Sequence, residues 1–286
     1  MGLRKGFTIV ELVIGLAILG IVLVVAVQAL AQFLRIQTDQ EAFTSAQTKL
    51  RRVGEVIAQD VRGSIFGGVV NVPRVSDSSG FSVALIAGGV GYQVLPYATT
   101  SATSIQAIGS PMFGGTDRAF LYAGGQGVVL PLSSAPSVSG NTFTLSFSSC
   151  GATVPFAGSS AAAGSSNSTL VFPVRAAAYW LDSSSQTLRY QENGQAAQDL
   201  AYNITQFEVE YIYSDGAGNF ATNPGGYNAG GSVRMSLASG WTLSGLRVTL
   251  SARERSFGGF KTRTYSNEIS LASNGVLELN QVVSCR

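Results

Sequence analysis

The stretch Arg4-Lys-Gly-Phe-Thr-Ile-Val-Glu11, followed by the uncharged run from Leu12 to Ala31, decides the fold of this chain. As a helix, that run spans about 30 Å, the thickness of the hydrocarbon core of a bilayer. Two basic residues precede the run, and Arg35 is the first basic residue after it. The positive-inside bias therefore predicts a single membrane span with a cytoplasmic N-terminus, and the chain after Arg35 lies outside.

Glu11 does not suit a plain membrane anchor, because an isolated carboxylate costs a few kcal/mol deep in lipid. The order of basic leader, Gly6, Phe7 and a carboxylate at Glu11 resembles the cleavage and methylation motif of type IV prepilins. The resemblance implies that a prepilin peptidase cuts between Gly6 and Phe7 and N-methylates Phe7. It also implies that Glu11 pairs with the Phe7 amine of a neighbouring subunit during assembly. The alternative is an ordinary signal anchor with Glu11 at the interface.

Beyond Arg35, apolar residues recur at steps of three, four and seven, the spacing of one helical face. We expect an amphipathic continuation of the helix, ended by Gly67-Gly68, with its apolar stripe packed on a sheet. We interpret the charged residues between the apolar positions as a solvated face. The stripe comprises Ile36, Phe43, Ala46, Leu50, Val53, Ile57, Val61 and Ile65.

From Val69 onward, short alternating segments separated by Gly, Ser, Asn and Pro predict β-strands. Two Gly- and Ser-rich segments, 151–168 and 215–231, are expected to be long exposed loops. The predicted strands are 81–86, 141–147, 169–173, 176–181, 187–191, 204–214, 245–255 and 261–271.

These patterns predict an α+β chain with the type IV pilin fold, in which a long N-terminal α-helix packs on an antiparallel β-sheet domain. The expected organisation is a prepilin leader (1–6), a transmembrane and assembly helix (7–34), an amphipathic extracytoplasmic helix (35–67) and a β-rich globular domain (68–286).

The amino-acid composition limits the catalytic and binding chemistry open to this chain. The chain has 18 Lys+Arg, 16 Asp+Glu and no His, so its formal charge of +2 gives no general attraction to nucleic acid. Without His, the common triads and His-ligated metal sites are excluded. Asp215-Gly-Ala-Gly-Asn219 faintly resembles a calcium loop, but a plain turn is favoured because further oxygen ligands are missing. We expect no enzyme activity, no cofactor and no metal.

Cys150 and Cys285 are the only cysteines, and they lie far apart in the sequence. Two thiols in an exported chain more often pair than stay free, so we expect a disulfide, with two buried free thiols as the alternative.

Four cations gather near the C-terminus. Arg253 and Arg255 share one face of a predicted strand, Lys261 and Arg263 share one face of the next, and 256–260 is the expected turn. One hypothesis is that this basic hairpin contacts DNA. The alternatives are a solvated edge that discourages strand pairing and an interface with another pilin subunit.

The segments Tyr179-Trp-Leu-Asp182, Leu188-Arg-Tyr190 and Leu246-Arg-Val-Thr-Leu250 resemble PilW-like and J-type minor pilins and pseudopilins. The length of the chain, and Gln28 where major pilins often have proline, also favour a minor subunit. The resemblance implies a role in initiation or at the tip of a type IV pilus. The alternatives are a tip subunit for DNA uptake or adhesion, and a type II secretion pseudopilin.

The same resemblance implies the partners and the location. The partners are other pilin subunits, the prepilin peptidase and an inner-membrane assembly platform. The chain would be a single-pass inner-membrane protein before assembly and part of a periplasmic or surface filament afterwards.

Overall fold

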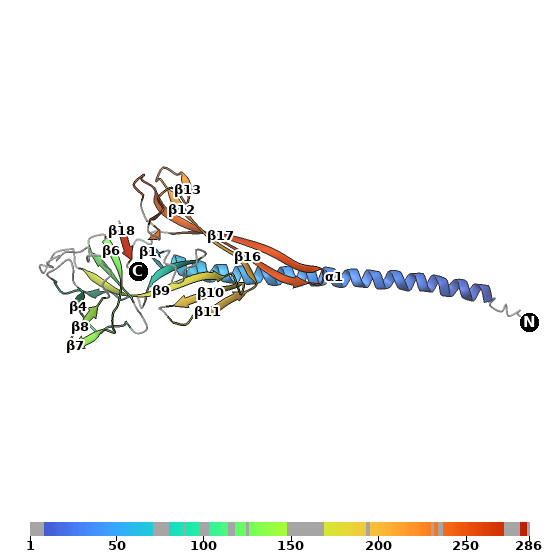
Figure 1. Ribbon diagram of the computed structural model, residues 1–286, viewed down its shortest axis with the longest axis horizontal. Helices are drawn as coiled ribbons and strands as arrows, with labels where there is room; N and C mark the ends of the chain where they lie inside the picture. The colour runs from blue at the N-terminus through green and yellow to red at the C-terminus, as the bar shows by residue number, and fades with distance from the viewer. Residues whose placement is uncertain are drawn as a thin grey trace, which may run out of the picture. The chain divides into compact units, whose positions relative to one another are not determined.

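The computed structural model describes residues 9–70, 80–87, 90–97, 103–113, 118–123, 126–147, 169–192, 195–229, 232–233, 237–271 and 281–284. It confirms the predicted α+β class, because one long helix, α1 (Ile9–Arg62), is followed by a β-sheet domain whose strands are nearly all antiparallel (Figure 1). The chain forms two compact units. Unit 1 comprises Met1–Thr48 and Arg253–Arg263, and unit 2 comprises Lys49–Ala252 and Thr264–Arg286.

Helix α1 ends five residues before the predicted end at residue 67. Arg62 is its last residue, and the backbone then turns at Gly63 into strand β1 (Ser64–Val70), which includes Gly67 and Gly68. The Gly63 N–H donates to Gln59 O at 3.0 Å, and the Ser64 hydroxyl donates to Val61 O at 2.7 Å. These two bonds satisfy carbonyls of the last turn, so Gly63 and not Gly67-Gly68 ends the helix.

The predicted apolar stripe is confirmed from Ala46 to Val61, whereas Ile65, its last predicted member, lies in strand β1 and not on the helix. Ala46, Leu50, Val53, Ile57 and Val61 are all buried. Ile36 was expected in the same stripe, but half of its surface is exposed. Burial of the stripe therefore begins after Ile36, within the amphipathic half of α1.

The largest sheet belongs to unit 2. Its main path runs β1, β2 (Gly80–Ile86), β9 (Leu170–Asp182), β5 (Arg118–Ala123), β6 (Gln126–Pro131) and β18 (Gln281–Ser284). Strand β9 also pairs with β10 (Thr187–Glu192) and β3 (Tyr92–Gln93), and β10 pairs with β11 (Gln198–Tyr202). The pairing of β18 with β6 is parallel, and the other pairs are antiparallel.

A second sheet has the order β13 (Phe220–Thr222), β12 (Ile204–Ser214), β16 (Thr242–Ser256) and β17 (Gly259–Ser270). Two smaller sheets complete the described fold. One has the order β4 (Ser104–Ile108), β8 (Thr142–Ser146) and β7 (Ser137–Ser139), and the other pairs β14 (Asn228–Ala229) with β15 (Ser232–Val233).

The structure confirms most predicted strands and corrects two segments. The strands predicted at 169–173 and 176–181 are one strand, β9, which passes through Pro173 without a break. The Pro173 carbonyl still accepts a 2.8 Å bond from Ala87 N, so the missing N–H does not end pairing on that side. The predicted loop 215–231 contains the short strands β13 and β14, whereas 151–168 lies outside the described residues.

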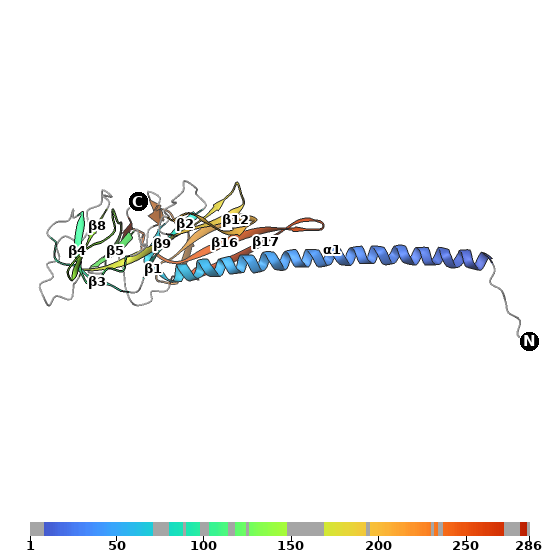
Figure 2. The same cartoon turned by 90° about the horizontal axis from the view of Figure 1, so that it is seen from below.

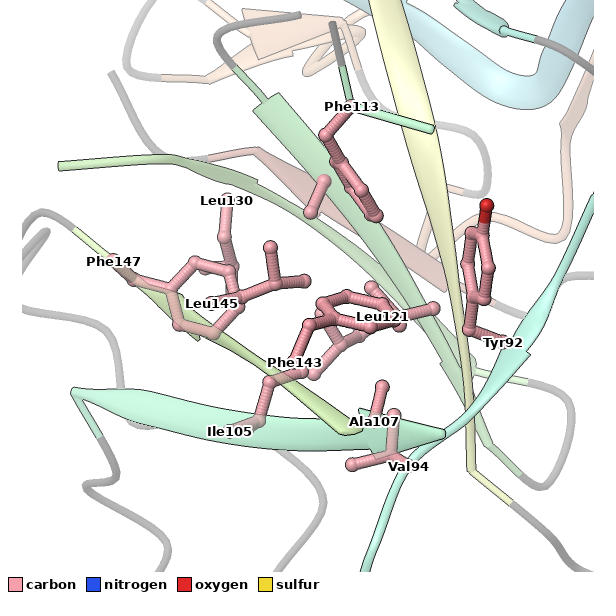
Figure 3. Close-up of a cluster of buried hydrophobic side chains, with 12 residues drawn as sticks. Tyr92, Val94, Ile105, Ala107, Phe113, Leu121, Leu130, Phe143, Leu145 and Phe147 are labelled. Atoms are coloured by element: carbon pink, nitrogen blue, oxygen red, sulfur yellow. The ribbon is translucent and has the colours of Figure 1, made fainter. Parts of the chain in front are cut away.

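Two apolar clusters hold the sheets of unit 2 together. In one, Tyr92, Phe113 and Phe143 pack their rings within 5.9 Å of one another, and the Tyr92–Phe143 pair is edge-to-face (Figure 3). In the other, Phe81 stacks on Tyr179 at 5.4 Å and contacts Phe207 at 6.0 Å, which joins the sheet containing β9 to the sheet containing β12. Such aromatic pairs contribute beyond their buried area.

Candidate functional site

The prepilin-like motif leads into the start of α1. Gly6 and Phe7, the predicted cleavage and methylation residues, lie outside the described residues, while Glu11 lies in the first turn of the helix. A carboxylate is favourable there, because the N-terminus of a helix carries partial positive charge. The structure thus places the predicted assembly carboxylate at the start of α1, with the apolar run directly after it.

The first half of α1 is apolar on every side. Large side chains from Ile9 to Leu34 are between 49% and 82% exposed, whichever face they occupy. Among the described residues, α1 is the helix long and apolar enough to cross a membrane. A helix that is apolar all round needs lipid or other helices around it, so the length and composition of this half suit a single-pass membrane anchor.

Two glycines interrupt the side-chain surface of this half. A Cβ added at Gly15 or at Gly20 would meet no atom within 4 Å. Neither glycine is therefore required for packing inside the single chain. Small residues on apolar helices allow close approach of a second helix, and the two positions are available for that in an assembly.

A hairpin latch follows the apolar half. We use this name for Asp39 and Phe43 on α1 together with Ser256, Lys261 and Arg263 on the β16–β17 hairpin. The Ser256 hydroxyl donates to Asp39, and Lys261 Nζ lies 3.1 Å from Asp39 Oδ2. The Arg263 guanidinium lies 4.2 Å from the centre of the Phe43 ring. These contacts hold the hairpin against the helix within unit 1 (Figure 2).

Asp39 is the centre of the latch. Its hydrogen bond from Ser256 and its ion pair with Lys261 lower the pKa of its carboxyl. The sequence-based interpretation of Asp39 as part of a solvated face is therefore wrong. The partners of Asp39 lie more than two hundred residues later in the chain, so the local pattern did not indicate them.

The four cations of the predicted basic hairpin lie on opposite faces. Lys261 and Arg263 contact α1, whereas Arg253 lies over Phe260 at 4.0 Å. Ser256 also faces α1, so Arg253 and Arg255, an odd number of residues away, point to the other face. The hairpin and its turn near 256–260 form as predicted, but the cations make two pairs instead of one cluster.

The end of α1 is fixed by a second polar network, in unit 2. Tyr179 Oη donates to Asp60 Oδ2 at 2.6 Å, and Arg175 bridges Asp60 and Glu192 at 3.3 Å and 3.4 Å. Tyr190 Oη donates to the same Glu192 at 2.8 Å. Burial, strengthened by the bond to Asp60, raises the pKa of Tyr179 far above its usual range.

This network contradicts the interpretation of Asp60 as solvated, since its side chain is only 14% exposed. Arg175 was not singled out from the sequence. The available signal was a lone charge inside the apolar strand Leu170–Asp182, because a charge in a buried strand needs a partner.

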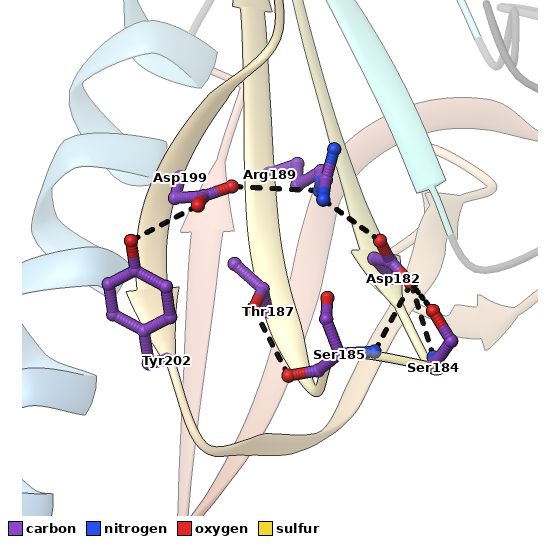
Figure 4. Close-up of polar contacts among 7 residues, drawn as sticks. All are labelled: Asp182, Ser184, Ser185, Thr187, Arg189, Asp199 and Tyr202. Atoms are coloured by element: carbon purple, nitrogen blue, oxygen red, sulfur yellow. Dashed lines mark hydrogen bonds and ion pairs between the residues drawn. The ribbon is translucent and has the colours of Figure 1, made fainter.

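A third network ties β9, β10 and β11 together (Figure 4). Arg189 Nη2 lies 3.1 Å from Asp182 Oδ2, and Arg189 Nε lies 3.6 Å from Asp199 Oδ1. Tyr202 Oη donates to Asp199, and Asp182 accepts a 2.6 Å bond from the Ser184 hydroxyl, which lowers the Asp182 pKa. The network holds strands β9, β10 and β11 in register, and its carboxylates are engaged in hydrogen bonds and ion pairs.

The candidate calcium loop closes on itself. The Asp215 carboxylate accepts bonds from Ala217 N at 2.8 Å, from Asn219 N at 3.1 Å and from Asn219 Nδ2 at 2.6 Å. These bonds lower its pKa, chiefly through the Asn219 amide. Across the described part of the chain, no group of three acidic or Cys side chains is placed to hold a metal.

Cys150 and Cys285 lie outside the described residues, so their expected pairing stays a prediction.

No curated protein and no solved structure matches the chain. Residues 1–27 match the family model described as the prokaryotic N-terminal methylation motif. That motif implies processing by a prepilin peptidase and assembly with other pilins. This match indicates a type IV prepilin-like protein, and the apolar helix and the antiparallel sheet domain that follow the motif fit that family.

Proposed function

We propose that the chain is a minor pilin or pseudopilin that takes part in the initiation, or forms part of the tip, of a type IV pilus. The observation that carries the proposal is the contrast within α1. Its half up to Leu34 is apolar on all sides and exposed, whereas the stripe from Ala46 to Val61 is buried. The exposed half is then free to leave the lipid and pack among the helices of other subunits.

Glu11 is proposed to guide that packing. It sits in the first turn of α1, where the cut after Gly6 would leave the Phe7 amine four residues away in the chain. In a dry helix bundle, an amine and a carboxylate from neighbouring subunits attract far more strongly than in water. The pair would set the axial position of the incoming subunit on the assembly platform.

The role is structural in this proposal, and the chain is not an enzyme. The polar networks support this, because Asp60, Asp182 and Asp215 are all held by hydrogen bonds or ion pairs inside the fold. A minor rank is supported by the length of the chain and by the resemblance to PilW-like and J-type subunits.

The experiment is complementation of a strain that lacks the gene. We expect wild-type chain to restore filaments, and Glu11→Ala to be cleaved normally but poorly incorporated. Glu41→Ala is the matched control, because it removes an exposed carboxylate from the same helix. Wild-type incorporation of Glu11→Ala would remove the pairing role.

A type II secretion pseudopilin is the second candidate, since the same leader, helix and sheet serve both machines. The same deletion strain separates the two. Loss of surface pili with intact secretion supports the pilus, and the reverse result assigns the chain to secretion.

A further inference from the structure

We propose that the turn of the β16–β17 hairpin is a membrane-interface anchor that rests on the phospholipid headgroups beside α1. We call it the interfacial tip and define it by Arg253, Arg255, Phe257 and Phe260 with Arg35 of the helix. The proposal rests on the membrane anchoring of α1 and goes beyond the role in assembly.

The contacts between hairpin and helix run in order along α1. Arg263 lies over Phe43, Lys261 and Ser256 meet Asp39, and Phe257 lies under Arg35, at 5.2 Å from the guanidinium carbon to the ring centre. The turn is therefore the part of the hairpin closest to the membrane-spanning segment. The hairpin points toward the bilayer.

The depth of the turn follows from the helix. With a rise of about 1.5 Å per residue, Arg35 lies about 6 Å beyond Ala31, the last of the twenty residues after Glu11 that suffice to span the hydrocarbon core. The headgroup layer on each side of the hydrocarbon is about 5 to 8 Å thick. Arg35, and with it Phe257, is thus at headgroup level whenever residues 12–31 fill the hydrocarbon core.

The side chains at this level suit that layer. Phe257 and Phe260 are 68% and 58% exposed, although each is a large apolar ring. Arg253 lies over Phe260 and Arg35 over Phe257, so each ring carries a cation beside it. Aromatic rings with adjacent cations are typical of membrane interfaces, where the ring enters the acyl boundary and the cation meets phosphate.

The two faces of the hairpin have different roles. Lys261 and Arg263 hold the hairpin on α1, while Arg253 and Arg255 remain exposed on the other face. Glu254 is the one acidic residue of the hairpin segment in unit 1, against four cations. The tip is therefore net positive, which favours anionic lipid.

The test uses the full chain reconstituted in vesicles of phosphatidylglycerol and phosphatidylcholine with brominated acyl chains. Phe257→Trp places a fluorophore at the tip, and Phe220→Trp is the matched control, because Phe220 is also 68% exposed but lies on β13. We expect bromine to quench the added emission of Phe257→Trp at least twofold more than that of Phe220→Trp. Equal quenching at the two positions overturns the proposal.

A second variant and a competing ligand test the proposal further. Asp39→Ala removes the acceptor of the latch. In the Phe257→Trp background we expect Asp39→Ala to lower the quenching by bromine. The thermal transition, followed by the fluorescence of Trp180 and Trp241, checks that the variant is folded. Duplex DNA is added in parallel. A change of Phe257→Trp emission with DNA but not with brominated lipid assigns the tip to nucleic acid and overturns the membrane role.

Discussion

The hydroxyl of Tyr179 donates a 2.6 Å hydrogen bond to the carboxylate of Asp60 and so joins the central strand β9 to the last turns of α1. Tyr179 is almost fully buried, and the same carboxylate meets Arg175. This bond fixes the helix on the sheet domain at the point where the chain turns into β1.

Asp60→Ala is expected to destabilise the protein by about 2 kcal/mol, because it leaves the buried Tyr179 hydroxyl without its acceptor and removes one of the two carboxylates that hold Arg175. The measurement is urea unfolding of the detergent-solubilised chain, followed by Trp fluorescence. Arg51→Ala is the control, since the Arg51–Glu55 pair is more than half exposed and is expected to contribute little to stability. Equal effects of the two variants would contradict the role of Asp60.

Alkaline pH is expected to destabilise the fold through its buried tyrosines. Burial raises the pKa of Tyr179, Tyr190, Tyr211 and Tyr213 above their usual value of 10.0. The folded chain then holds protons that the unfolded chain releases, so stability is fully present below about pH 10 and falls as the pH rises further. Tyr179→Phe should reduce that slope by up to about 1.4 kcal/mol per pH unit. If the dependence of stability on pH between 9 and 11.5 is the same in Tyr179→Phe as in the wild type, the contribution of Tyr179 is contradicted.

The sequence-based predictions succeeded where the pattern is local. The long apolar helix, the buried stripe from Ala46 to Val61 and strand 204–214 each depend on residues a few positions apart, and the structure confirms them. The helix end was wrong because Gly63 and Gly67-Gly68 are both acceptable stops. Pairing of Ser64–Val70 with β2, which decides between them, is a tertiary contact.

The polar sites were harder to predict, because their partners are distant in sequence. Asp60 is 119 residues from Tyr179, and Asp39 is 217 residues from Ser256, so both resembled solvated charges. For the basic hairpin, period-two alternation placed each pair of cations on one face of its own strand. Which faces coincide depends on the length of the turn, here Phe257-Gly258, and the sequence alone did not determine it.

Gly54 of α1 lies against the ring of Tyr265 on β17. A Cβ at Gly54 would come within 2.5 Å of Tyr265 Cε1, so the ring must move. Overpacking of this kind costs about 1 to 3 kcal/mol, which exceeds the gain of about 1 kcal/mol in helix propensity. We expect Gly54→Ala to lower the melting temperature, and to be neutral or stabilising in a Tyr265→Ala background. Equal losses in both backgrounds would exclude this contact as the cause.

Calcium is expected to leave the stability unchanged. The Asp215 carboxylate already accepts three hydrogen bonds within its own loop, and a metal would have to displace them. The check is the melting temperature in millimolar CaCl₂ and in EDTA. A rise in calcium that Asp215→Ala abolishes would establish a metal site there.

The predicted cleavage after Gly6 can be tested directly. The match of residues 1–27 to the methylation motif predicts that Gly6→Ala blocks cleavage, because Gly6 lies directly before the predicted cut. We expect the variant to stay in the membrane at precursor mass, with residues 1–6 retained and no methyl group on Phe7. Gly2→Ala is the matched control, since it changes a glycine of the same leader away from the cut, and it should mature normally. Intact-mass and N-terminal peptide measurements distinguish the outcomes. A Gly6→Ala chain that begins at methylated Phe7 would show that the leader is recognised through other residues, and the assignment of Gly6 would fail while the helix and the sheet domain would stand.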